Sequence, residues 1–173
     1  MTQQPAAGAT EATGMLDLWP EVLARRAAFL RAIDVTEAQA RRTPAGKPED
    51  WCILQVAQHV LGWTDNVADV IEAIAAGRPA TKHPRGYIPL DAPGLPDTIV
   101  EVRHALVRAS MRFATLPQRL PAHPNAELTV AHEVYGPMNY REWFARSAAH
   151  DLDHTGQVEA LRREILGEAM GGA

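Results

Sequence analysis

The sequence YREWFARSAAHDLDHTGQVEALRR, residues 140–163, predicts a continuous helix around which the rest of this 173-residue chain is organised. Residues in and just after this stretch recur every three or four positions, which is the spacing of one face of an α-helix. The ends of the resulting stripe are apolar and its middle is polar. Since an unpartnered polar group in a protein interior costs about 1–3 kcal/mol, we expect the polar middle to bind something. The stripe consists of Trp143, Ser147, His150, His154, Gln157, Leu161 and Ile165.

Two histidines of this stripe, His150 and His154, are one helical turn apart, so both imidazoles can point toward one place. A third, His59, lies beside the apolar seam of an earlier predicted helix, between Val56 and Trp63. Neutral imidazole binds zinc, nickel, copper and iron, and three protein ligands leave a coordination position open, as in catalytic zinc sites. We therefore predict a metal site of His59, His150 and His154, with ring nitrogens about 2.0–2.2 Å from one ion.

The sequence as a whole predicts an all-α protein. No stretch shows the apolar–polar alternation of a β-strand, and the first helical segment is expected to bend or break near Asp34. Long connections, residues 77–96 and 117–139, join helices 2–3 and 3–4, so the pattern is that of a four-helix bundle with long connections between those helices. The four segments with apolar residues at helical spacing are residues 16–42, 53–76, 96–116 and 140–168.

Length and composition predict a single domain over residues 15–168, with a disordered N-terminal tail of residues 1–14 and a short tail of residues 169–173. The net charge of -4 and the scattered basic residues argue against nucleic-acid binding. A single cysteine, Cys52, excludes an internal disulfide framework and a zinc ribbon. No apolar run matches a membrane span and no secretory signal is evident, so we expect a cytoplasmic protein without a membrane partner.

Two segments carry a resemblance to a known family. Trp51–His59 reads WCILQVAQH, and Trp143–Gln157 ends in HDLDHTGQ, after which Leu161-Arg162-Arg163 continues the match. One histidine in helix two, and H-x-x-x-H followed by Gln in helix four, resembles the DinB-like family of metal-binding four-helix bundles. The resemblance covers about residues 16–166.

The resemblance implies a divalent transition metal at the three histidines, zinc or nickel above all, with iron as a further candidate. The family includes bacterial transferases that use mycothiol or bacillithiol, so a low-molecular-weight thiol and a small electrophile are the implied partners, and a homodimer the implied assembly. The chain departs from the family pattern at Cys52, where serine is usual, and at Gln55, where glutamate is frequent. Both positions concern the cap of helix two rather than the metal site.

Several functions are compatible with such a site. A metal ion lowers the pKa of a bound thiol or water, so the first is a metal-dependent enzyme that transfers or activates a low-molecular-weight thiol. Metal-dependent hydrolysis fits the same ligands. The alternative is a non-catalytic, dimeric metal- or ligand-binding bundle with a stress-related role, which the lack of an evident general base favours. A wide pocket open to water beside the histidines would favour an enzyme.

Other polar residues have both a functional and a structural interpretation. Gln157, one turn after His154, is a candidate catalytic or ligand-orienting residue, or else a core glutamine. Cys52 is expected about 10 Å along the helix from His59, too far to share its metal, and His132 is expected to be solvated in a loop. Four arginines could pair with substrate carboxylates, or else form a solvated helix surface: Arg141, Arg146, Arg162 and Arg163.

Overall fold

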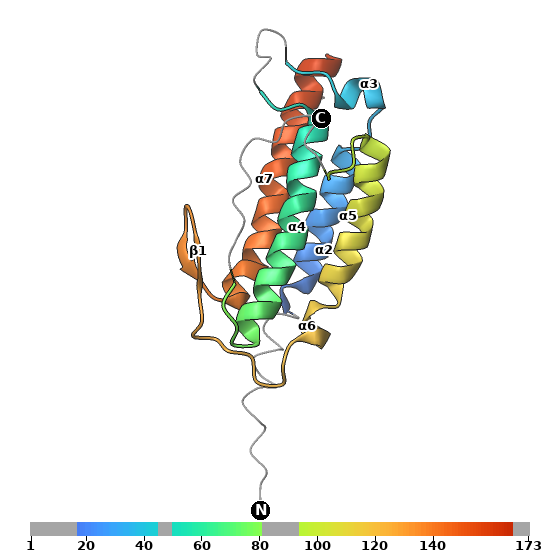
Figure 1. The fold of residues 1–173 in the computed structure, drawn as a ribbon. Helices are drawn as coiled ribbons and strands as arrows, with labels where there is room; N and C mark the ends of the chain where they lie inside the picture. The colour runs from blue at the N-terminus through green and yellow to red at the C-terminus, as the bar shows by residue number, and fades with distance from the viewer. Residues whose placement is uncertain (1–16, 45–49, 81–93, 168–173) are drawn as a thin grey trace, which may run out of the picture.

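The computed structural model describes residues 17–44, 50–80 and 94–167, in which four long helices form a bundle, as predicted (Figure 1). The predicted tails, residues 1–14 and 169–173, lie outside the described residues. Among the described helices, none combines the length and the apolar character that a membrane span requires. The long helices are α2 (Trp19–Ala32), α4 (Ile53–Ala75), α5 (Ile99–Ala114) and α7 (Tyr140–Leu166).

The directions of the helices show why the connection between α4 and α5 is long. Helices α2 and α7 run in one direction and pack against each other, whereas α4 and α5 both run in the opposite direction (Figure 1). Because α4 and α5 are parallel neighbours, the end of α4 at Ala75 and the start of α5 at Ile99 lie at opposite ends of the bundle (Figure 1). The predicted break in the first segment separates α2 from the single-turn helix α3 (Glu37–Ala40), which Thr36 caps.

The connection from α5 to α7 contains a second single-turn helix, α6 (Leu116–Arg119), and then a short antiparallel hairpin. Its strands are β1 (Val130–His132) and β2 (Gly136–Met138), with His132 opposite Gly136. Gly136 has φ +72°, a conformation that side chains disfavour and glycine tolerates. The hairpin leads directly into Asn139, whose side chain accepts hydrogen bonds from the backbone N–H groups of Arg141 and Glu142 and so starts α7.

The interior consists of two apolar clusters with a polar layer between them. The layer centres on Arg26 of α2, which donates two hydrogen bonds to the Asp151 carboxylate of α7, at 2.7 and 3.1 Å. The same guanidinium donates to Thr64 Oγ1 of α4 at 2.7 Å and to Ser110 Oγ of α5 at 2.9 Å. One buried side chain thus connects all four long helices, and its carboxylate partner is the residue next to His150.

Candidate metal centre

Three histidines from two helices converge on one point. His59 lies on α4 and His150 and His154 lie on the neighbouring, antiparallel α7, and one ring nitrogen of each lies within 4.8 Å of those of the others. The Nε2 atoms of His59 and His150 are 3.2 Å apart. Two ligand atoms at about 2.0–2.1 Å from one zinc-like ion are separated by no more than about 4.2 Å. The two Nε2 atoms are therefore close enough to bind the same ion. The cluster could hold a metal ion.

The hydrogen bond of His154 defines which of its nitrogens is available to an ion. Its Nδ1 lies 2.8 Å from Oε1 of Gln157, one turn further along α7. An amide oxygen only accepts, so Nδ1–H is the donor, and in the neutral ring the lone pair is then on Nε2. Metal-bound histidines are usually oriented in this way, by a hydrogen bond from the nitrogen that does not bind the metal.

Burial favours the neutral forms of His150 and His154. His150 is 5 % exposed, and its burial lowers its pKa well below the ordinary value, an effect that positive charge on His154 or His59 would reinforce. Burial also lowers the pKa of His154, although the hydrogen bond to Gln157 opposes this shift. The Nδ1 atom of His150 has no hydrogen-bond partner among the described residues. Neutral imidazoles with available lone pairs are the form that binds metals.

Two tryptophans enclose the imidazoles. Trp63 of α4 stacks on His150, with ring centroids 4.0 Å apart and an interplanar angle of 9°. On the other side, Trp51 lies 4.9 Å from the ring of His59 and stacks at 6.4 Å on His154. These ring contacts, two stacked and one tilted by 53°, limit the rotation of the imidazole rings and exclude water from part of their surface. The two tryptophans are therefore walls of the cluster.

The prediction for His132 was wrong. It is 9 % exposed rather than solvated, because the hairpin folds it against Trp63 and Trp143, at centroid distances of 5.7 and 5.4 Å. Its Nδ1 accepts a hydrogen bond from the backbone N–H of Val134 at 3.0 Å. His132 thus lies behind the ring that stacks on His150 and supports it. His132 is not part of any helical spacing that would have indicated its burial. The sequence feature that could have indicated it is Gly136, which pairs with His132 in the hairpin and has a positive φ.

An open groove of about 550 Å³ reaches the cluster from the side of α7. Trp51, His154 and Gln157 are among the residues that line it. Gln157 is exposed, so it is not the core glutamine of the structural interpretation, and its direct role in catalysis stays a prediction. None of the four arginines considered as substrate partners lines this groove. Its other lining residues are Pro44, Asp50, Ala160, Leu161 and Glu164.

Cys52 does not contribute to the cluster. It is the N-cap residue of α4, and Oε1 of Gln55 accepts a hydrogen bond from its backbone N–H at 3.0 Å. The thiol is fully buried, and burial raises its pKa. A thiol with a raised pKa stays protonated at neutral pH and is a poor nucleophile or metal ligand.

Comparison with known proteins gives the family of the chain. No curated protein and no solved structure matches the sequence. A sequence model of the DinB superfamily matches residues 21–158, a range that includes α4, the hairpin and all three histidines of the cluster. The match spans most of the chain, and the helical bundle agrees with it. The chain belongs to the DinB superfamily.

Proposed function

We propose that His59, His150 and His154 bind a divalent transition metal, zinc or nickel first, and that the protein is a metal-dependent enzyme that activates a low-molecular-weight thiol. The observation that carries the proposal is the convergence of three ring nitrogens to within 4.8 Å, from two helices that belong to a DinB bundle. When bound, the metal supplies Lewis acidity, which favours the thiolate form of a thiol over the thiol.

The residues around the cluster support an open site rather than a sealed one. The groove beside His154 gives a small molecule access to one side, and Trp63 closes the other. A catalytic site keeps an exchangeable position, whereas a structural site is closed by protein ligands. This access favours an enzyme over a bundle in which the metal has only a structural role.

In the proposed reaction the sulfur of the thiol forms a bond to an electrophilic carbon. The S–H proton leaves to solvent or buffer, and the leaving group departs with the electron pair of the broken carbon bond. Gln157 holds His154 in the ligating tautomer during this step, and Trp51 and Trp63 keep the imidazole rings in place. The groove positions the substrate.

The test combines metal analysis with an assay of thioether formation. We expect purified protein to contain close to one transition metal per chain. The metal-loaded protein should couple mycothiol, bacillithiol or a simpler thiol to monochlorobimane, and chelation or His150→Ala should abolish the coupling. Bound metal without thiol-dependent turnover would favour the non-catalytic bundle, and turnover of an ester without thiol would favour a hydrolase.

Replacing Gln157 with alanine is expected to weaken metal binding by about 10–100-fold, the usual effect of losing a hydrogen bond to a metal-binding histidine. The residue is exposed, so the fold should be unaffected. Gln157→Glu keeps an acceptor at the same place and should bind the metal at least as tightly as the wild type. Competition with a chromogenic chelator measures all three affinities. An unchanged affinity in Gln157→Ala would show that the hydrogen bond does not orient His154 for a metal.

A further inference from the structure

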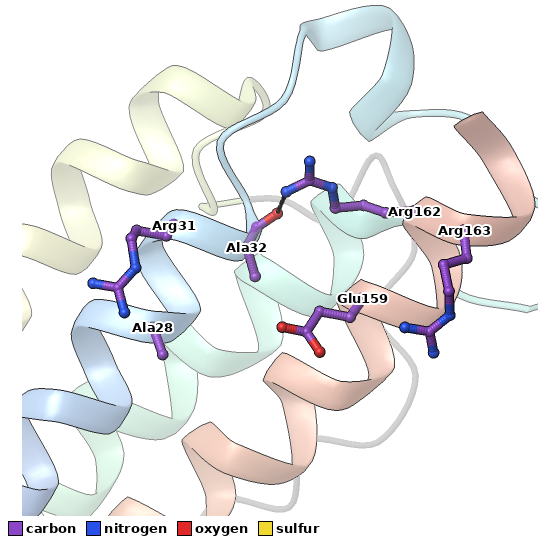
Figure 2. Close-up of a pocket in the computed structure, with 6 residues that line it drawn as sticks. All are labelled: Ala28, Arg31, Ala32, Glu159, Arg162 and Arg163. Atoms are coloured by element: carbon purple, nitrogen blue, oxygen red, sulfur yellow. Dashed lines mark hydrogen bonds between the residues drawn. The ribbon is translucent and has the colours of Figure 1, made fainter. Parts of the chain in front are cut away.

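A second concave site lies on the opposite flank of α7. It is a pocket of about 380 Å³ between the last turn of α2 and the C-terminal part of α7 (Figure 2). Its volume is within the range of small-molecule sites. Two of the α2 residues that line it, one turn apart, are alanines, whose small side chains leave room beside the helix. We call it the arginine pocket, and it is lined by Ala28, Arg31, Ala32, Glu159, Arg162 and Arg163.

The charges in this pocket are not neutralised by one another. Glu159 precedes Arg163 by four residues on α7, a spacing at which ion pairs commonly form. Yet neither Arg31, nor Arg163, nor Glu159 forms an ion pair within the part of the chain that the structure describes. Three guanidinium groups and one carboxylate give the pocket a net charge of about +2, in a chain whose formal net charge is -4.

The fold holds part of this charge in place before any ligand arrives. Arg162 reaches across from α7 and donates a hydrogen bond from Nη1 to the backbone oxygen of Ala32, at 3.2 Å (Figure 2). Arg31 and Arg163 lie in the last turns of α2 and α7, where positive side chains interact favourably with the helix dipole. These interactions offset part of the repulsion between the like charges.

We propose that the arginine pocket binds a small phosphate ester that also carries an ammonium group. A phosphate monoester has close to two negative charges at neutral pH and three terminal oxygens, so it can accept hydrogen bonds from several guanidinium groups at once. A carboxylate offers only one charge and two oxygens. Glu159 would repel a simple anion, and its carboxylate instead fits a positively charged group next to the phosphate.

This site is separate from the histidine cluster. His154 and Gln157 line the groove on one flank of α7, while Glu159 and Arg163 line the pocket on the other. Binding to the arginine pocket therefore does not depend on a metal, and the proposal does not rest on the proposed enzymatic function.

The test is an NMR titration of the full-length chain with inorganic phosphate, ethyl phosphate and phosphoethanolamine, in a low-salt buffer without other anions. We expect saturable shifts confined to residues of the pocket. Arg31→Ala and Arg163→Ala should each weaken binding of ethyl phosphate about tenfold, as expected for the loss of one charged hydrogen-bonding group. Arg25→Ala is the matched control, because it removes the same charge from the same helix at an exposed pair with Glu21.

Two further variants separate the parts of the proposal. Glu159→Gln should bind inorganic phosphate more tightly than the wild type and lose the preference for phosphoethanolamine over ethyl phosphate. His150→Ala should bind all three probes like the wild type, which excludes binding through a metal. Equal losses in Arg25→Ala and Arg31→Ala, shifts spread over the surface, or loss of binding in His150→Ala would each overturn the proposal.

Discussion

Asp151→Ala is expected to lower the free energy of unfolding by about 3–5 kcal/mol, the usual cost of leaving one partner of a buried ion pair without the other. Asp151 is 1 % exposed and Arg26 is 8 % exposed, and two hydrogen bonds join them. Without the carboxylate, the guanidinium would keep only its neutral partners, Thr64 and Ser110. Chemical denaturation followed by circular dichroism measures the loss.

The neighbouring residue Asp153 provides the control. It pairs with Arg146 at 2.9 Å, but its side chain is 61 % exposed, so Asp153→Ala should cost no more than about 1 kcal/mol. The double replacement Arg26→Leu, Asp151→Leu removes both charges together and should recover much of the stability lost in Asp151→Ala. If Asp151→Ala and Asp153→Ala destabilise the protein equally, the polar layer does not hold the four helices together as we describe.

The apolar periodicity of the sequence predicted the long helices because each buries a stripe that recurs every three to four residues. The direction of the helices could not be predicted in this way. Periodicity reports which face of a helix is buried, and not which helix covers it. A connection as long as residues 77–96 is compatible with a parallel or an antiparallel neighbour, and only the packing of α4 against α5 decides between them.

The histidine cluster was predictable because His150 and His154 lie on such a stripe and His59 lies beside one. The polar layer was not predicted, because charged residues are rarely buried unless they are paired. A signal for it exists. Arg26 continues the spacing of Val22 and Phe29, which are both buried. On α7 a second buried stripe runs beside the one that contains the histidines, with Asp151 at its centre: Phe144, Ala148, Asp151, Thr155 and Val158. The helical spacing of Arg26 and Asp151 relative to these apolar residues would have predicted that both are buried.

The second large effect that we expect is a coupling between pH, metal and stability. Only an imidazole with a free lone pair binds a metal, so protons compete with the metal for His59, His150 and His154. A metal present at about 100 times its Kd adds about 2.7 kcal/mol to the free energy of unfolding. The melting temperature of the metal-loaded protein should therefore fall toward that of the metal-free protein as the pH drops below about 6.5.

The metal-free protein should also lose stability in acid, because the pKa of His150 is lower in the folded protein than in the unfolded chain. Burial, reinforced by charge on His154 and His59, lowers the pKa of folded His150 below the value of about 6.5 in an unfolded chain. Between these two values the unfolded chain binds a proton that the folded protein does not. The stability is thus complete above about pH 6.5 and is lost as the pH falls toward the folded pKa, by about 1.4 kcal/mol per pH unit for this residue.

His150→Ala should remove the metal dependence and weaken the acid dependence, because it deletes a metal ligand and an imidazole whose pKa burial lowers, while the lowered pKa of His154 remains. The helical content should be retained, since the apolar residues of all four long helices are unchanged. His123→Ala, at an exposed histidine outside the cluster, should behave like the wild type. The measurement is a series of thermal melts against pH, with and without chelator. The comparison within each variant cancels any change in packing against Trp63. At about pH 7.5, where an ordinary histidine is mostly neutral, chelation should lower the melting temperature of the metal-loaded wild type. If the melting temperature is unchanged although metal analysis shows that the ion has been removed, the cluster does not couple metal binding to folding.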